Sequence, residues 1–191
     1  MNRIHRVFCR SSLWRRSLEK RLLPWALAGL PTTGLGDDVL EVGPGPGLVT
    51  DFLRSQNVPL TSIEIDSKLA RALRARVPED EVTVVGGDAT DMPFADGCFS
   101  AALSFTMLHH VPSASRQDQL LAEVCRVLRP GGIFVGSDSL SSRAFEMFHW
   151  FDTLVPVDPK TLGSRLEAAG FEDIEVETAS RSFRFRAKRP G

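Results

Sequence analysis

The stretch VLEVGPGPG, residues 39–47, decides the fold of this 191-residue chain. An apolar run carries an acidic residue near its end and then breaks into three glycines at every second position. Glycines at that spacing allow a sharp turn and let a ligand lie against bare main chain before a helix. Two later apolar runs also end in an acid, at Glu64 and at Asp88. Three strands that each end in a carboxylate predict a nucleoside site at the carboxyl edge of a parallel sheet.

Apolar runs and amphipathic segments alternate along most of the chain, which predicts a parallel sheet with right-handed crossovers. The tail departs from this alternation, because its last two strands are joined by a short turn and therefore form an antiparallel pair. The expected strands are 38–42, 60–65, 82–86, 99–105, 132–138, 171–177 and 182–187. The expected helices are one or two within 11–29, then 46–56, 67–76, 115–128 and 159–170, with a long connection at 139–158.

The glycine stretch alone leaves two classes of cofactor open. A dinucleotide fold requires G-x-G-x-x-G and an acid about 20 residues further on. Here the third glycine comes one place early, at Gly47, and Leu48 stands at the dinucleotide position. Glu41, two residues before the first glycine, has no role in the dinucleotide fingerprint either. The stretch instead resembles motif I of the class I S-adenosylmethionine-dependent methyltransferases, an apolar strand followed by Asp or Glu, any residue, and G-x-G-x-G.

This resemblance extends over residues 37–187. The segment SIEID at 62–66 is similar to the family's second-strand motif, and GDATDMPF at 87–94 to its G-D-A-x-x-L-P-F segment. LHHV at 108–111 looks like the loop after the fourth strand, and LRPGG at 128–132 matches the turn L-[KR]-P-G-G. The pattern is most similar to the branch that methylates small molecules and includes quinone-biosynthesis enzymes.

The resemblance implies a Rossmann-like three-layer α/β sandwich with a seven-stranded, mostly parallel sheet in the order 3-2-1-4-5-7-6 and an antiparallel last strand. It implies S-adenosylmethionine as cofactor, with Glu64 holding the ribose hydroxyls, Asp88 accepting from the adenine amino group and the glycine loop facing the methionine carboxylate. Asp66 is the alternative to Glu64 for holding the ribose hydroxyls; if it does not take that role, we expect it to cap a helix. The expected cofactor-binding residues are Glu41, Gly43, Pro44, Gly45, Gly47, Glu64, Ile65, Asp88, Ala89 and Ser104.

The sequence says less about the acceptor, and it leaves three possibilities for the methylated atom: oxygen, carbon or nitrogen. His109 and His110 follow the fourth strand, where the family opens toward its acceptor, and either could take a proton from a hydroxyl group. Trp14, Phe148, His149 and Asp152, with His109, are candidates for the pocket wall; the aromatic residues equally fit a core role. The alternatives are a non-catalytic cofactor-binding module that serves a partner and, less favoured, a dinucleotide-dependent oxidoreductase.

Composition indicates the compartment in which the protein works and which kinds of site it lacks. Three scattered cysteines without a C-x-x-C pair indicate neither disulfide nor metal, so we expect a cytoplasmic protein without a metal site. No apolar run approaches the length of a membrane span. Residues 1–21 hold seven bases and one acid, and residues 181–191 five bases and no acid.

The basic start fits a transit peptide, a basic surface helix or, the favoured interpretation, the solvated face of a helix that covers the cofactor. We therefore divide the chain into a helical covering segment, 1–36, and a methyltransferase domain, 37–191. The acidic body argues against nucleic acid as a partner. A small molecule is the expected partner, and the chain is expected to be a monomer or a homodimer.

Overall fold

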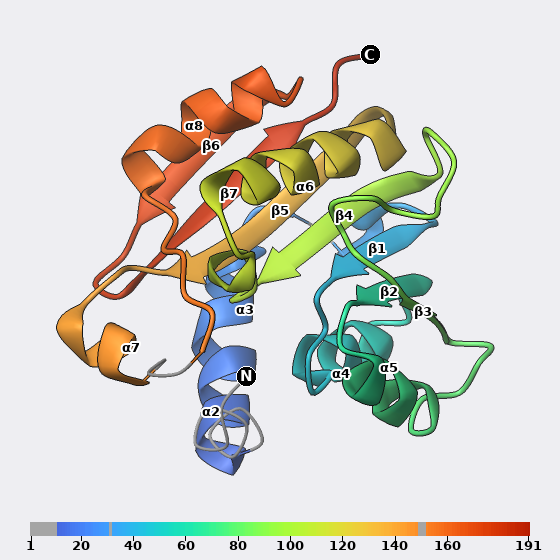
Figure 1. Ribbon diagram of the computed structural model, residues 1–191. Helices are drawn as coiled ribbons and strands as arrows, with labels where there is room; N and C mark the ends of the chain where they lie inside the picture. Colours follow the sequence, from blue (N-terminus) through green and yellow to red (C-terminus); the bar gives the residue numbers. More distant parts are fainter. Residues whose placement is uncertain (1–10, 31, 149–151) are drawn as a thin grey trace.

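The computed structural model describes residues 11–30, 32–148 and 152–191. Its core is one seven-stranded sheet in the order β3-β2-β1-β4-β5-β7-β6, as predicted (Figure 1). β7 runs antiparallel to both of its neighbours, β5 and β6, and the other pairs are parallel. The strands are β1 (Val39–Val42), β2 (Leu60–Glu64), β3 (Val82–Gly86), β4 (Phe99–Phe105), β5 (Leu128–Ser139), β6 (Glu172–Thr178) and β7 (Ser182–Lys188).

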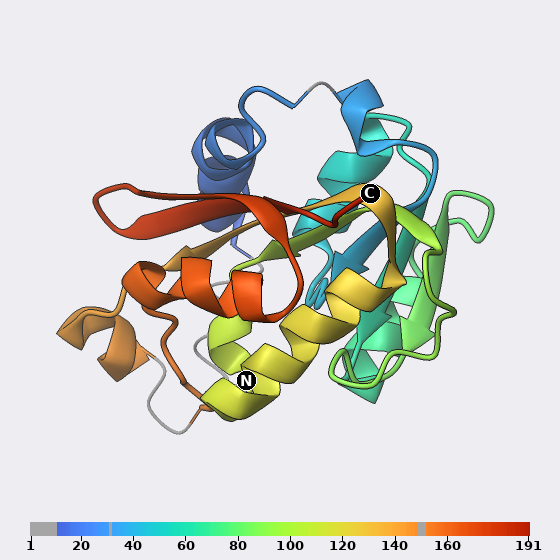
Figure 2. The same cartoon turned by 90° about the horizontal axis from the view of Figure 1, so that it is seen from above.

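Helices cover both faces of the sheet and complete the three layers (Figure 2). One layer holds α4 (Leu48–Ser55), α5 (Ser67–Arg74) and an amino-terminal helical segment made of α2 (Ser12–Ser17), a π-helical stretch (Leu18–Leu22) and α3 (Leu23–Ala26). The other layer holds α6 (Ala114–Val127) and α8 (Pro159–Ala168), which contact each other and the sheet. The short α7 (Arg143–Phe148) lies in the 139–158 connection, where we predicted no helix.

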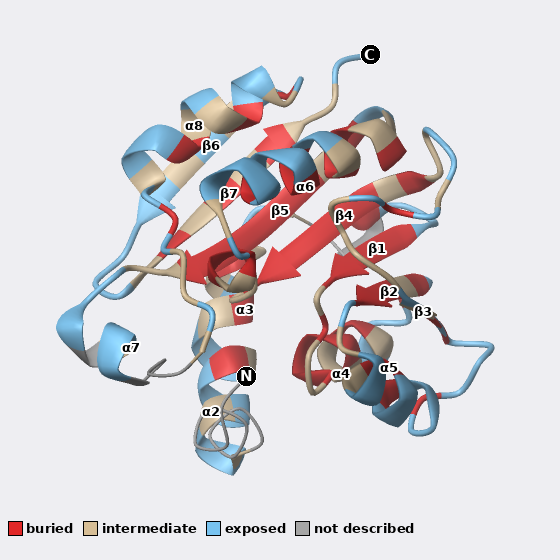
Figure 3. Cartoon of the chain, in the orientation of Figure 1, coloured by how far each residue is buried: buried red, intermediate tan, exposed pale blue. Residues whose placement is uncertain are grey.

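Two apolar clusters, one on each face, hold the layers together. Buried residues are concentrated in the central strands of the sheet (Figure 3). On the α6 and α8 face, Phe134, Phe183 and Phe185 are almost completely buried. The strict alternation of the last strand predicted that Phe183 and Phe185 share a face, and their burial confirms it. On the opposite face, Leu18 and Leu23 of the amino-terminal segment pack into the cluster around α4 and α5. The amino-terminal segment is therefore part of the folded domain's core.

Four of the described helices begin after a residue whose side chain caps them. The carboxylate of Asp66 accepts the amides of Lys68 and Leu69 and starts α5, while the hydroxyl of Ser113 accepts the amide of Arg116 and starts α6. Helix α4 begins at Leu48, two residues later than expected, because the residue before it, Gly47, has a left-handed backbone conformation (φ 81°).

The basic residues of the last strand attach the amino-terminal segment to the sheet. The guanidinium of Arg184 lies 5.3 Å from the ring centroid of Trp25 and donates to the Trp25 carbonyl oxygen. Arg186 donates to the carbonyl of Ala28 at 2.9 Å. These carbonyls belong to the end of the helical segment, where backbone acceptors lack helical partners. The positive charges of Arg184 and Arg186 therefore have a structural use.

Within the described residues, no helix is long and apolar enough to cross a membrane.

Candidate cofactor and acceptor site

The glycine loop lies between β1 and α4 at the carboxyl edge of the sheet. Gly43, Gly45 and Gly47 all have positive φ values of 68°, 54° and 81°. A Cβ atom at Gly43 would overlap the side chain of Met107, so the loop after β4 packs directly on the first glycine. A Cβ atom at Gly45 would meet nothing within 4 Å, so the main chain is open there. The turn is closed by the amide of Gly47, which donates to the Pro44 carbonyl at 2.8 Å.

Glu64 joins the end of β2 to this loop. Its Oε2 accepts the amide of Gly45 at 3.0 Å, and its Oε1 accepts the amide of Asp66 at 2.8 Å. Burial raises the pKa of Glu64, against the opposing effect of these backbone hydrogen bonds. The competing acid, Asp66, uses its carboxylate to cap α5. The structure thus brings Glu64, rather than Asp66, against the glycine loop.

Asp88 follows β3 at the same edge. Its Oδ1 accepts the amide and the hydroxyl of Thr90 at 2.8 and 2.9 Å, and its Oδ2 lies 3.2 Å from Nη2 of Arg116. Partial burial raises the pKa of Asp88, but the Thr90 hydrogen bonds and the Arg116 charge outweigh it and lower the pKa overall. Ala89 is half-buried beside it, whereas Ile65, after Glu64, is 70% exposed. An exposed isoleucine near these acids offers an apolar surface to a flat ring.

Glu41 is buried on the α4 face and connects three elements. Its Oε2 accepts the hydroxyl of Thr50 from α4 and that of Ser62 from β2, both at 2.7 Å. Its Oε1 is buried and has no hydrogen-bond partner among the described residues. Burial raises the pKa of Glu41 to about 7, despite the two hydroxyl hydrogen bonds. A carboxylate with one satisfied oxygen is suited to orient the loop and to receive a cationic group.

We expect Glu41→Gln to remove a pH dependence of stability. The folded pKa of Glu41, about 7, exceeds its ordinary value of 4.5, so its favourable contribution is complete below pH 4.5 and is lost as the pH rises through 7. The loss amounts to about 3 kcal/mol at most. In urea unfolding of the ligand-free protein between pH 5 and 8, the free energy of unfolding of Glu41→Gln should rise relative to that of the wild type as the pH rises.

Glu175→Gln, at an exposed position of β6, is the matched control for that experiment and should unfold in parallel with the wild type. If the stability of Glu41→Gln also followed that of the wild type across this pH range, Glu41 would ionise at the same pH in the folded and unfolded chains.

The histidines predicted to face the acceptor lie after β4, next to the end of β5. His109 Nδ1 lies 2.5 Å from Oδ1 of Asp138, and the His109 amide donates to Asp138 Oδ2 at 3.0 Å. Both side chains are almost completely buried. His110 lies beside His109 and directs Nδ1 to the Thr153 carbonyl at 3.2 Å. Ser104 is buried in β4, and its hydroxyl has no hydrogen-bond partner within the described residues.

Thr106 turns the chain from β4 toward the two histidines in a strained conformation. Its φ is 51°, which is unusual for a β-branched residue. We expect Thr106→Asn to raise the free energy of unfolding by roughly 1 kcal/mol, because asparagine tolerates this region and threonine does not. Urea unfolding measures the change. Thr83→Asn, on an exposed position of β3, is the control and should give no gain, and a gain there of the same size would refute the strain argument.

The predicted pocket residues come from several separate elements. Trp14 lies on α2 and packs against the apolar cluster of the α4 face. The backbone of the segment before α8 joins the histidine turn, because the Val155 amide donates to the His109 carbonyl at 2.8 Å. Asp152 lies at the start of that segment. His149 lies outside the described residues, and Phe148 ends α7 with a side chain that is likewise not described.

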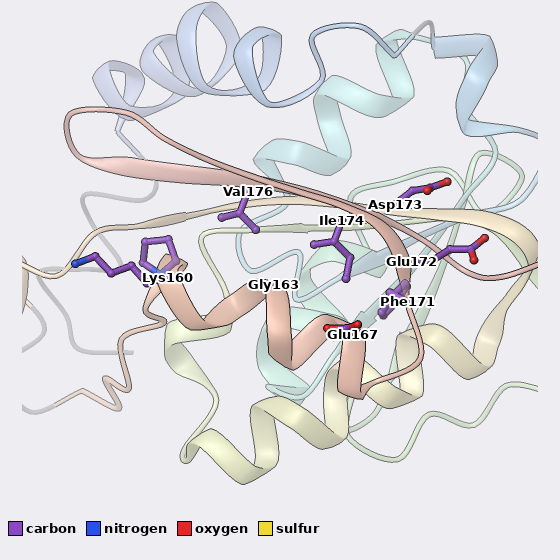
Figure 4. Close-up of a pocket in the computed structure, with 9 residues that line it drawn as sticks. Lys160, Gly163, Glu167, Phe171, Glu172, Asp173, Ile174 and Val176 are labelled. Atoms are coloured by element: carbon purple, nitrogen blue, oxygen red, sulfur yellow. The ribbon is translucent and has the colours of Figure 1, made fainter.

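A groove lies between α8 and β6, away from the glycine loop. Lys160 and Gly163 of α8 and Phe171, Asp173 and Ile174 around β6 line it (Figure 4). Since β6 is the edge strand beyond β5 and β7, this groove is distant from the glycine loop on β1. The glycine loop, Glu64 and Asp88 therefore stay the candidate site. Among the described residues, no cluster of His, Cys, Asp or Glu is arranged to hold a metal ion.

Arg116 and Asp138 contact predicted site residues, Asp88 and His109, and were not themselves predicted from the sequence. Asp138 ends a predicted strand, and an acid at that place could have been noticed by the rule that identified Glu64 and Asp88. Arg116 carries no such signal, because it reaches Asp88 across 28 positions from the first turn of a surface helix.

Comparisons with known proteins agree with this geometry. The family described as "Methyltransferase domain" matches residues 40–136, just over half of the chain. A fatty-acid O-methyltransferase of Mycolicibacterium smegmatis is 39% identical over 141 residues, 73% of this chain and 49% of the relative. A demethylmenaquinone methyltransferase of Beutenbergia cavernae is 33% identical over 58% of this chain and 45% of its own length. The chain thus spans about half the length, or less, of these relatives.

A solved structure shares the fold. The phosphoethanolamine N-methyltransferase 2 of Haemonchus contortus, in complex with S-adenosylhomocysteine, superposes with a TM-score of 0.72 at 16% identity and covers 98% of this chain and 57% of its own. The family match and the glycine loop both indicate S-adenosylmethionine as the cofactor. The quinone-biosynthesis branch is not singled out, since the relatives include a fatty-acid enzyme. With the family match, the sheet order and the glycine loop in agreement, the chain belongs to the class I S-adenosylmethionine-dependent methyltransferases.

Proposed function

We propose that this chain transfers a methyl group from S-adenosylmethionine to a small, partly apolar molecule. The observation that carries the proposal is the convergence of the open glycine loop, Glu64 and Asp88 at the carboxyl edge of β1, β2 and β3. Glu64 has lone pairs for the ribose hydroxyls, and Asp88 for the adenine amino group. Relatives named for fatty-acid and demethylmenaquinone methylation support an apolar acceptor.

Within this proposal, the segment 1–36 covers the cofactor end of the domain. Arg15 of α2 supports this role, because its Nη2 lies 3.4 Å from Oδ2 of Asp51 in the first turn of α4. That turn directly follows the glycine loop. Trp14, Asp152 and the α7 segment are proposed to wall the acceptor.

Titration calorimetry of the purified chain tests the cofactor. We expect micromolar binding of S-adenosylmethionine and S-adenosylhomocysteine and no heat from NAD. Binding of NAD alone would reverse the assignment in favour of an oxidoreductase. Binding of the sulfur ligands without methyl transfer to any member of a broad acceptor panel would favour the alternative of a non-catalytic cofactor-binding module, especially if a partner protein co-purifies.

A further inference from the structure

Arg76 contacts the glycine loop at the point where the loop enters α4. Arg76 follows α5, and its amide donates to the Leu73 carbonyl at 2.9 Å. Its Nη2 lies 3.2 Å from the carbonyl oxygen of Pro46 and 3.3 Å from that of Gly47. Its Nη1 donates to Oδ1 of Asp51 in the first turn of α4. One guanidinium therefore connects the end of the glycine loop to the helix that follows it.

The close approach of Arg76 gives a reason for a glycine at position 47. A Cβ atom at Gly47 would overlap Nη2 of Arg76 and would come 2.6 Å from Cδ1 of Leu73. The same glycine has a left-handed backbone, with a φ of 81°. Gly47 therefore allows the turn and also leaves room for the guanidinium to lie directly on the main chain.

These contacts set the direction of an amide at the amino end of α4. In a trans peptide the C=O and the N–H point in opposite directions, and none of the described peptide bonds is cis. The Gly47 carbonyl accepts from Nη2 of Arg76 and from the Asp51 amide, at 3.3 and 3.0 Å. The N–H of Leu48 therefore points the other way, out of the amino end of α4. Amides at this end of a helix lack intrahelical acceptors and bind anionic groups such as a carboxylate.

The carboxylate that Arg76 contacts is also held from its other side. Oδ2 of Asp51 lies 3.4 Å from Nη2 of Arg15 in α2, and the Asp51 side chain is only 18% exposed. Arg54 is 4.0 Å from Oδ1 of Asp51, but it makes a closer ion pair with Glu81 at 2.6 Å. Asp51 thus joins the start of α4 to two other elements, the end of α5 and the amino-terminal helical segment.

We propose that Arg76 is a positioning residue for the methionine half of S-adenosylmethionine. It acts through the glycine loop, whose amides it holds in place before the cofactor carboxylate arrives, so that less entropy is lost on binding. A guanidinium suits this role because its planar fork can meet a carboxylate and two carbonyls at once, which an ammonium group cannot do as well. This inference rests on the proposed function, because it takes the glycine loop as the cofactor site.

Two ligands that differ in the amino-acid part of the cofactor test the proposal. S-adenosylhomocysteine carries the carboxylate and the ammonium group, whereas 5′-methylthioadenosine is a nucleoside thioether that lacks both. We expect Arg76→Met, which removes the donors but keeps an unbranched stem, to raise the dissociation constant of S-adenosylhomocysteine by roughly 10-fold. The dissociation constant of 5′-methylthioadenosine should not change. Titration calorimetry of the full chain measures both constants.

Two further variants separate position from charge. Arg71→Met removes the same charge from an exposed position of α5 and is the matched control, so it should bind both ligands like the wild type. Arg76→Lys keeps the charge without the fork and should recover only part of the lost affinity for S-adenosylhomocysteine. If circular dichroism shows that Arg76→Met does not fold, the same selective loss is expected in Arg76→Lys.

Four results would overturn the proposal. An equal loss of both ligands in Arg76→Met would reduce Arg76 to a general structural role, and no loss of either would show that the loop does not need it. Full affinity in Arg76→Lys would mean that charge alone suffices. Equal binding of the two ligands by the wild type would show that the loop does not hold the amino-acid part. Failure of the wild type to bind S-adenosylhomocysteine at all would instead refute the proposed function, so the two failures are distinguishable.

Discussion

Glu64→Gln should weaken binding of S-adenosylmethionine by roughly 100-fold, equivalent to about 2.7 kcal/mol. The carboxylate faces a backbone donor on each oxygen, Gly45 on one and Asp66 on the other. A glutamine has only one acceptor oxygen, so its amide nitrogen must face one of these two N–H groups in either orientation. The substitution therefore loosens the glycine loop and removes the charge proposed to hold the ribose hydroxyls. Titration calorimetry gives the dissociation constant.

Two measurements make this result interpretable. Circular dichroism should show that the variant keeps its fold, because only one backbone contact is lost. Glu175→Gln, an exposed position on the edge strand β6, removes the same charge far from the loop and should bind like the wild type. Wild-type affinity in Glu64→Gln would show that Glu64 does not bind the cofactor.

Gly136→Ala should destabilise the folded chain by roughly 3 kcal/mol, the upper range for overpacking a core. Gly136 lies in β5 between β4 and β7, and an added Cβ atom would come 2.5 Å from the Ser104 carbonyl oxygen and overlap the Phe185 ring. The carbonyl belongs to a central strand, so it cannot move aside as a flexible side chain could. Urea or thermal unfolding measures the loss.

Gly86→Ala is the control for this prediction. Gly86 ends β3, and a Cβ atom there would meet nothing within 4 Å. The change adds the same methyl group without a collision, so stability should stay near that of the wild type. Equal effects of the two substitutions would mean that the central strands can separate to accommodate a methyl group.

The sequence predicted the strands and the cofactor edge because both depend on local signals, whereas the sheet order was implied by the family resemblance. Strand ends, glycines and acids are adjacent in the chain at residues 39–47, and the alternation at 182–187 marks one buried face. Helix α7 was missed because its six residues, Arg143–Phe148, carry fewer than two turns of pattern. Such short segments take their structure from the contacts around them.

The site was predicted in part for the same reason. Glu41, Glu64 and Asp88 stand at strand ends, and the structure places all three at the predicted edge. Their partners are not visible in the sequence, because Thr50, Ser62 and Arg116 meet them only through the packing of separate elements. The roles of the ten expected cofactor residues, and of Trp14, His109, His110 and Asp152 on the acceptor side, stay predictions.

The attachment of the amino-terminal segment by Arg184 and Arg186 has a consequence for synthesis on the ribosome. The contact between Arg184 and Trp25 spans 159 positions, and β7 itself inserts between β5 and β6. Until residues 182–188 emerge, β5 has an unpaired edge, and the amino-terminal helical segment at 12–26 and the residues just after it lack their contacts with Arg184 and Arg186. Such edges can pair with other chains. We therefore expect the nascent protein to be vulnerable to aggregation until this strand emerges, because the strand both pairs with the edge of β5 and anchors the amino-terminal helical segment.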